Sequence, residues 1–229
     1  MVKENLQKIR SIIDDTCIKA GRDPSGVLLV AVSKTKPVEA IKEALEAGQI
    51  HFGENRVQEL VEKMGQLNNS IMWHMIGTLQ TNKIKYMVDR VDWIESVHKT
   101  KALKEIEKRA GSVKRVIQTL IQVNISGENQ KSGCEPGELR AMLKYAQGLK
   151  WVRVRGLMGI AELTDDPEDV RPQFRLLRTL RDQHRDLENE SVTLDHLSMG
   201  MTHDFHVAIE EGSTMVRIGT AIFGKRDYA

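Results

Sequence analysis

The sequence predicts an α/β fold: a single-domain (β/α)8 barrel of the TIM type that spans residues 1–229 and carries an extra helix at its N-terminal end. Three observations predict it. The chain has 229 residues, and barrels of this kind use about 200 to 250 as one domain. Short apolar segments alternate with helical patterns, and no low-complexity linker interrupts them. Eight such segments with helical connections fit a closed barrel better than an open sheet.

The first expected element is a helix that precedes the barrel. Leu6, Ile9 and Ile13 recur at helical spacing, and Gly21 ends the pattern. Residues 27–32 then form an uninterrupted apolar run, which is typical of a strand buried on both faces of a parallel sheet. The same alternation continues to the end of the chain. We expect strands at 27–33, 50–53, 71–76, 91–95, 115–123, 152–157, 192–196 and 214–218, and helices at 38–47, 55–67, 81–89, 100–110, 136–147, 168–188 and 203–211.

Composition and charge exclude several classes of protein. Apolar residues make up 40% of the chain and charged residues 29%, which is typical of a globular protein with a sizeable core. The net charge is only +2, so no overall field favours a nucleic acid or an anionic membrane as partner. We find no secretory signal and no apolar run near the roughly 18 residues of a membrane span. Cys17 and Cys134 lack metal-ligand spacing, and we expect a cytoplasmic protein.

Lys34 is the first candidate functional residue. It follows the first apolar strand directly, so the strand would carry its side chain from the barrel core to the rim. A nucleophilic lysine must be neutral, and partial burial beside an apolar barrel lowers the pKa of an amine and frees it to condense with an aldehyde. By position alone, a solvated rim lysine remains the more frequent case.

Two glycine-containing loops near the end of the chain predict a phosphate site. Leu197–Met201 follows the seventh strand, and Gly219 follows the eighth and opens a last short helix. Barrels frequently bind phosphate with these two loops, where glycine lets the backbone approach and helix N-terminal N–H groups donate. Arg217 would point toward the same cavity. In the alternative interpretation, Gly200 and Gly219 are ordinary turn glycines and Arg217 pairs with a carboxylate at the rim.

Several long segments resemble the YggS/PROSC family of pyridoxal 5′-phosphate (PLP) homeostasis proteins. The resemblance runs from the first helix to the end of the chain. The segments that carry it are Val30–Pro37, Phe52–Glu59, Trp73–Lys83, Leu197–Met201 and Val216–Gly224.

The resemblance implies a fold-type III PLP site like that of the barrel domain of bacterial alanine racemase. Lys34 matches the lysine that forms the Schiff base, and Ser198, Gly219 and Thr220 match positions at the phosphate. Arg217 matches the residue at the pyridine nitrogen. Because a guanidinium stays protonated, it cannot accept the ring's proton, so the nitrogen should remain neutral and the cofactor should be a weaker electron sink.

The resemblance also implies further residues of the cofactor pocket. Asn55, His74 and Met158 fall on segments that line it, and Met199 belongs to the loop after the seventh strand. We assign no catalytic residue and no metal ligand. His203 and His206 are three residues apart and would share one helix face, but no third ligand stands at a motif spacing, so solvated or capping roles are favoured.

The favoured function is a non-catalytic protein that stores, protects or delivers PLP, with PLP-dependent apoenzymes as candidate recipients and with a monomer expected. Racemases of this fold type add a second domain whose tyrosine is the opposite-face acid/base, and we see no such segment here. The alternative is a low-activity amino-acid racemase that uses Lys34 as its sole base. A second alternative is a partner- or RNA-binding module that uses a basic stripe over Arg171–Arg185, although a solvated face is the default and no nucleic acid is expected.

Overall fold

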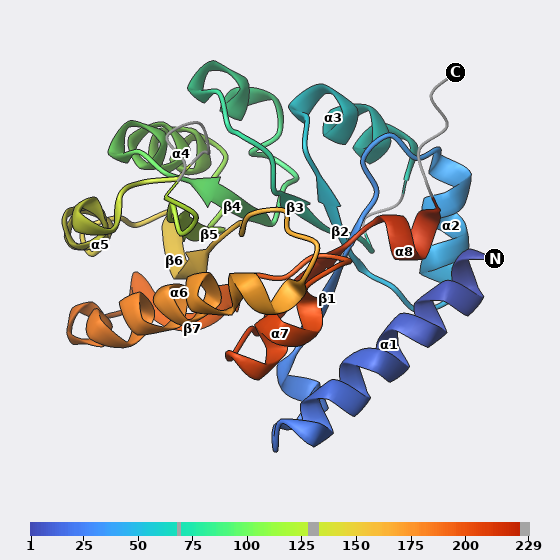
Figure 1. The fold of residues 1–229 in the computed structure, drawn as a ribbon. Helices are drawn as coiled ribbons and strands as arrows, with labels where there is room; N and C mark the ends of the chain where they lie inside the picture. The colour runs from blue at the N-terminus through green and yellow to red at the C-terminus, as the bar shows by residue number, and fades with distance from the viewer. Residues whose placement is uncertain (68–69, 128–132, 225–229) are drawn as a thin grey trace.

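The computed structural model describes residues 1–67, 70–127 and 133–224, and its centre is a closed barrel of parallel strands (Figure 1). The strands follow one another around the barrel in chain order, and β8 pairs with β1 to close it. This confirms the predicted fold class. The strands are β1 (Leu28–Val32), β2 (His51–Glu54), β3 (Met72–Met75), β4 (Trp93–Val97), β5 (Ile117–Gln122), β6 (Val152–Met158), β7 (Val192–Ser198) and β8 (Met215–Ile218).

Helices surround the barrel and cover the outer face of its strands, as the ribbon shows (Figure 1). With one face toward the helices and the other toward the barrel interior, a strand such as β4 is buried at every residue. The α-helices are α1 (Val2–Lys19), α2 (Val38–Glu46), α3 (Val57–Gln66), α4 (Thr100–Ser112), α5 (Leu139–Ala146), α6 (Arg171–Gln183), α7 (Phe205–Glu210) and α8 (Thr220–Phe223). Short 3-10 helices are η1 (Pro24–Gly26), η2 (Thr81–Tyr86), η3 (Pro136–Glu138), η4 (Pro167–Val170) and η5 (Arg185–Leu187).

The expected N-terminal helix is present as α1, which lies outside the barrel against α2, α7 and α8 (Figure 1). It buries Leu6, Ile9 and Ile13 on one face, as their spacing predicts. The Glu43 carboxylate of α2 accepts from the backbone N–H of Val2 at 2.8 Å and therefore caps the first turn from a neighbouring helix.

Four elements differ from the sequence-based expectation, and one of them, the helix expected at 136–147, consists of η3 followed by α5. The segment expected as a helix at 81–89 is the 3-10 helix η2, and it begins with Thr81 and Asn82, whose side chains disfavour an α-helix. The helix expected at 168–188 is split into η4, α6 and η5. The fourth strand was expected at 91–95 and lies at 93–97, because the Val91 N–H donates to Met87 O at 2.8 Å and completes the preceding turn.

The apolar core has two parts. The larger one includes the residues between the strands and the helices, such as Phe52 and Phe174. The smaller one contains Trp93, Leu120, Met158 and Met215. The barrel interior also holds buried polar side chains, which are unusual in a packed TIM-type core. Among the described residues, no helix combines the length and apolar character needed to cross a membrane.

Candidate functional site at the C-terminal rim of the barrel

Lys34 lies at the C-terminal rim, as its position after β1 predicts. The strand ends at Val32, Ser33 N–H still donates to Gly53 O of β2 at 3.0 Å, and the chain then turns at Lys34 and Thr35. Lys34 is half-buried. Thr35 has a φ of 63°, in the left-handed region that a β-branched residue rarely adopts. The turn that presents Lys34 is therefore held in an uncommon backbone conformation.

Gly219 and Thr220 lie beside the strand that leads to Lys34. β1 and β8 pair in register up to Ala31 and Ile218, so Gly219 comes next to Val32. A Cβ on Gly219 would stand 3.1 Å from Val32 O, closer than real Cβ atoms usually come, so this position favours glycine. Helix α8 begins immediately afterwards at Thr220. The barrel closure thus brings these two residues, which are far from Lys34 in sequence, to the same part of the rim.

Asn55 lies on the other side of Lys34, directly after β2. It is half-buried, and the backbone of Gly77 packs so closely on it that a Cβ there would come within 2.2 Å of Asn55 O. The close contact with Gly77 therefore fixes the path of the Asn55 backbone.

In the loop after β7, Gly200 has a φ of 94° and would bring a Cβ within 2.6 Å of Ala208 Cβ. Both glycines, Gly77 and Gly200, are required by backbone geometry.

Arg217 is buried inside the barrel, beneath the rim. One guanidinium nitrogen donates to Ser198 Oγ at 2.6 Å and the other to Gly159 O at 2.8 Å. A guanidinium has five N–H donors, so these two contacts do not exhaust it. Burial lowers the pKa of Arg217 and the charge of Glu95 opposes that shift. Two carboxylates act on its charge, Glu95 inside the barrel and the buried Asp204 in the loop after β7.

Glu95 is the centre of the interior polar groups. It lies on β4 with no exposed surface; its Oε2 accepts from Ser198 Oγ at 2.5 Å and its Oε1 is 2.6 Å from Nδ1 of His74. Burial raises the pKa of Glu95, but the hydrogen bond from His74, the charge of Arg217 and the hydrogen bond from Ser198 outweigh it, so that the pKa lies below its ordinary value. Glu95 is therefore ionised and balances the guanidinium.

The chain of polar contacts continues away from the rim. His74 stacks on Trp93 with ring planes 1° apart, and its Nε2 is 3.0 Å from Nδ1 of His51. Nδ1 of His74 faces the Glu95 carboxylate and its Nε2 faces Nδ1 of His51, so the two imidazoles share one hydrogen between them. Burial, followed by the charge of His74, lowers the pKa of His51 to about 4. Both ring nitrogens of His74 therefore have partners inside the protein.

A second buried cluster lies against the Lys34 turn, formed by Glu54, Glu59 and Lys63. The Lys63 ammonium donates to Ser33 O, Glu54 Oε1 and Glu59 Oε1 at 2.8, 2.7 and 2.7 Å. Its side chain is only 7% exposed. Burial raises the pKa of Glu54 although Lys63 and Ser33 oppose the shift, and its Oε2 is buried without a hydrogen-bond partner.

The predicted site residues thus have three kinds of surroundings. Lys34, Asn55, Gly219 and Thr220 are at the rim, whereas His74, Ser198 and Arg217 are in the barrel interior. Met158 packs in the smaller apolar cluster and Met199 is fully buried in the main core. The Ser198 hydroxyl contacts Glu95 and Arg217, so its predicted role at a phosphate rests on the resemblance alone.

Sequence reasoning missed Glu95, His51 and the cluster of Glu54, Glu59 and Lys63. One signal was present: Glu95 is a charge within the otherwise apolar or small run of β4, where a charged residue is fully buried only when it is paired. Lys63 has no comparable signal, because an exposed helical lysine would look the same in the sequence.

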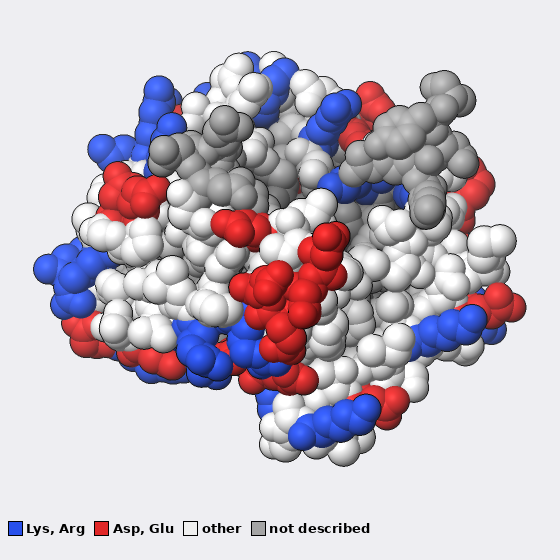
Figure 2. All heavy atoms as spheres, in the orientation of Figure 1, with Lys and Arg blue, Asp and Glu red and all other residues white. Residues whose placement is uncertain are grey.

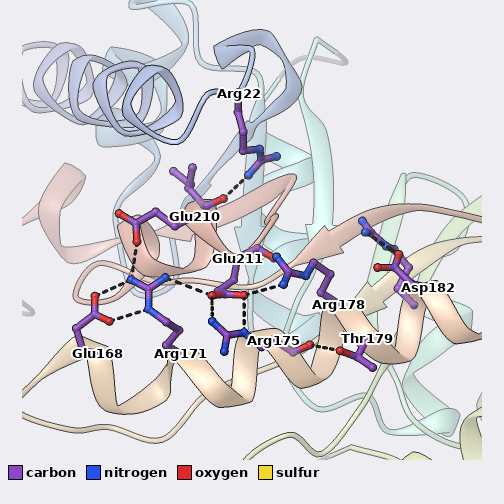
Figure 3. A network of polar contacts seen from close by, with 11 residues as sticks. Arg22, Glu168, Arg171, Arg175, Arg178, Thr179, Asp182, Glu210 and Glu211 are labelled. Carbon is purple, nitrogen blue, oxygen red and sulfur yellow. Dashed lines mark hydrogen bonds and ion pairs between the residues drawn. The ribbon is translucent and has the colours of Figure 1, made fainter.

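The basic stripe over Arg171–Arg185 is neutralised by acidic neighbours. Figure 3 shows Arg171, Arg175 and Arg178 of α6 converging on Glu211, whose side chain is 5% exposed. Arg171 also pairs with Glu168 and Glu210. Figure 2 shows basic and acidic side chains interspersed on the face it presents, with no continuous basic area. This arrangement favours the solvated, ion-paired face over a nucleic-acid surface.

His203 and His206 each contact a neighbouring group of the protein. His203 Nε2 lies 3.3 Å from Asp165 O, and the ring of His206 contacts that of Phe205. Within residues 1–67, 70–127 and 133–224, no three His, Cys, Asp or Glu side chains are grouped so that they could hold a metal ion. Cys17 and Cys134 are both buried as free thiols.

The parallel barrel with a lysine after its first strand defines a protein of the alanine racemase type. The chain matches the model of the alanine racemase N-terminal domain family over residues 2–227. More narrowly, it belongs to the family of pyridoxal phosphate homeostasis proteins. It is 47% identical to the pyridoxal phosphate homeostasis protein of Aquifex aeolicus over 227 residues, 98% of each chain, and 40% identical to that of Escherichia coli K12, covering 100% of this chain and 98% of the relative.

Solved structures agree with this assignment. The structure of PipY from Synechococcus elongatus PCC7942 with PLP bound is 36% identical, with a TM-score of 0.86 over 98% of this chain and 100% of that one. An alanine racemase from Corynebacterium glutamicum shares the fold, with a TM-score of 0.70 at 15% identity, and this chain covers 60% of it. The predicted family resemblance is confirmed.

Proposed function

We propose that this protein binds PLP at the C-terminal rim of the barrel, holds it as an imine on Lys34, and serves PLP homeostasis by keeping and releasing the cofactor without turnover. One observation carries the proposal: the half-buried Lys34 follows the strand end against which Gly219 packs, and helix α8 begins there at Thr220. The PLP-bound structure of PipY and the names of the close relatives support it.

The residues present fit the chemical groups of PLP. PLP supplies an aldehyde that condenses with a primary amine, a phosphate, and a pyridine ring that withdraws electrons. Lys34 offers the amine, the backbone at Gly219 can approach a phosphate closely because glycine has no Cβ, and Thr220 adds a hydroxyl next to it. Asn55 flanks the same turn and would orient the ring.

Arg217 would limit the chemistry of the bound ring. A guanidinium can donate a hydrogen bond to a pyridine nitrogen but cannot accept a proton from it. Glu95 acts on the guanidinium through its charge and through the Ser198 hydroxyl, which contacts both side chains. The ring nitrogen would therefore stay unprotonated and withdraw electrons weakly, which favours holding the cofactor over catalysis with it.

Borohydride reduction tests the proposal directly. The protein is incubated with PLP, reduced, digested and mapped by mass spectrometry. We expect a pyridoxyl adduct on the peptide that contains Lys34, its loss in Lys34→Ala, and its retention in the neighbouring control Lys36→Ala. An adduct confined to other lysines, or none, would overturn the assignment of Lys34.

The racemase alternative gives a different result with the same material. The PLP-loaded protein is held with an excess of an L-amino acid, and the D-isomer is followed by chiral chromatography. Sustained formation of the D-isomer that disappears in Lys34→Ala would replace the homeostasis role with an enzymatic one.

A further inference from the structure

Two residues next to Lys34 in sequence, Ser33 and Thr35, are bound by side chains from other elements. Lys63 donates to Ser33 O at 2.8 Å, and Ser33 Oγ donates to Glu54 Oε1 at 2.6 Å. On the other side of Lys34, the Thr35 N–H donates to Glu59 Oε1 at 2.5 Å. The backbone is thus held immediately before and immediately after the lysine.

The three side chains that hold the turn also hold one another. Lys63 contacts both carboxylates at 2.7 Å, and Glu59 and Lys63 are one turn apart on α3. Hydrogen bonds between ionised groups are shorter and stronger than neutral ones, and burial of Glu54 and Lys63 limits screening by water. The cluster therefore behaves as one rigid unit anchored on β2 and α3.

The backbone of the turn explains why such a unit is needed. Thr35 has a φ of 63°, which costs free energy for a β-branched residue and persists only when the surroundings impose it. The Glu59 carboxylate contacts the N–H of that same residue. Without this contact, the turn would relax toward ordinary backbone conformations and Lys34 would lose its fixed direction.

We propose that Glu54, Glu59 and Lys63 form a clamp that positions Lys34 for imine formation. The inference rests on the proposed function, because it assigns to the clamp a role in the same PLP site. Positioning residues act by removing the entropy cost of bringing the reacting groups together. The clamp should therefore matter for a ligand that bonds covalently to Lys34 and should not matter for one that only occupies the phosphate site.

Two ligands separate these effects. PLP has the aldehyde that reacts with Lys34, whereas pyridoxine 5′-phosphate has an alcohol at the same carbon and cannot form an imine. We expect Glu59→Ala to weaken PLP binding about tenfold, as loss of a charge-assisted hydrogen bond does, and to lower the visible absorbance of the imine. Its affinity for pyridoxine 5′-phosphate should equal that of the wild type.

Further variants guard against a merely structural effect. Glu59→Gln keeps an oxygen acceptor for the Thr35 N–H and should recover most of the PLP affinity, which also covers the case in which Glu59→Ala does not fold. Glu62→Gln changes an exposed carboxylate on the same helix and should bind both ligands normally.

The results distinguish the two hypotheses. If the wild type gives no borohydride-trapped adduct on Lys34, the proposed function itself fails. If the adduct forms but Glu59→Ala binds PLP as the wild type does, or Glu59→Gln binds it no better than Glu59→Ala, the clamp is wrong. Equal weakening of both ligands would also overturn the clamp, because it would indicate general damage to the rim.

Discussion

Glu95 on β4 and Ser198 on β7 are joined by a hydrogen bond of 2.5 Å although 103 residues separate them in the sequence. β4 and β7 are not neighbours in the sheet, so the bond crosses the barrel interior. The Ser198 hydroxyl also accepts from Arg217, which connects the buried guanidinium to the buried carboxylate. This contact links the positive charge of Arg217 to a negative charge inside the barrel.

The first prediction concerns the charge of Glu95. Glu95→Gln keeps the shape of the side chain but removes the larger of the two buried carboxylate charges, those of Glu95 and Asp204, that act on Arg217. We expect the free energy of unfolding to fall by about 3 to 5 kcal/mol, as when one partner of a buried ion pair is removed. Urea denaturation followed by circular dichroism measures the change.

A surface variant serves as the control for that prediction. Glu105→Gln removes the partly exposed partner of Arg109 on α4 and should cost less than about 1 kcal/mol. A loss at Glu95 no larger than the loss at Glu105 would show that the interior carboxylate does not balance Arg217.

The second prediction concerns pH. The pKa of His51 is about 4 in the folded protein, against about 6.5 in an unfolded chain. Between these values the unfolded chain binds a proton at His51 that the folded chain does not, so stability should fall as the pH drops from about 6.5 to 4. Urea midpoints at several pH values in this window should decline less steeply in His51→Gln than in the wild type. Parallel curves would contradict the low pKa.

The third prediction concerns the close contact of Gly77 with Asn55. In Gly77→Ala the new Cβ would clash with Asn55 O, and overpacking of this kind costs about 1 to 3 kcal/mol. Because Asn55 flanks the Lys34 turn, PLP affinity should fall as well. The matched control is Gly65→Ala on α3, where no atom lies within 4 Å of the new Cβ and the substitution should be neutral or mildly stabilising. Thermal unfolding and PLP titration are measured for both variants. If Gly77→Ala and Gly65→Ala behaved alike, the close contact between Gly77 and Asn55 would be contradicted.

The fourth prediction concerns the arginines of α6. Reversal of charge in Arg175→Glu and Arg178→Glu together places two carboxylates beside Glu211, which is nearly buried. We expect this double variant to unfold at a lower urea concentration than the wild type. A double reversal at the exposed Lys101 and Lys108 of α4 should leave the midpoint almost unchanged.

The same proteins test the RNA-binding alternative. If the arginines serve stability, neither the wild type nor the variants should bind single-stranded RNA in a salt-dependent way. Salt-sensitive binding by the wild type that disappears in the double variant of α6 would restore the RNA-binding hypothesis.

Local patterns in the sequence were sufficient for much of the fold. The apolar run that becomes β1, the spacing of Leu6, Ile9 and Ile13, and the regular alternation that follows depend on neighbours a few residues apart, and each predicted its element. The boundaries were less certain, as η2 and β4 show, because caps and turn hydrogen bonds decide where an element ends.

Part of the candidate site could also be read from the sequence. The position of Lys34 at a strand end and the glycines after the seventh and eighth strands predicted a rim site, and the family motifs specified the ligand. The sequence predicted that Arg217 lies near the same cavity, but it did not identify Glu95 as the carboxylate that balances its charge. Glu95 is remote in the chain, and only the closed barrel brings the two together.

The sequence by itself therefore determined the barrel, the family and the lysine at its rim, since these depend on periodicity and on residues that are contiguous. Only the tertiary structure decided what surrounds that lysine. Lys63 becomes a buried partner of Glu54 because β2 and α3 pack against the Lys34 turn, and burial turns an ordinary ion pair into a constraint. Packing between distant segments leaves no local pattern in the chain, which is why the clamp was not predicted.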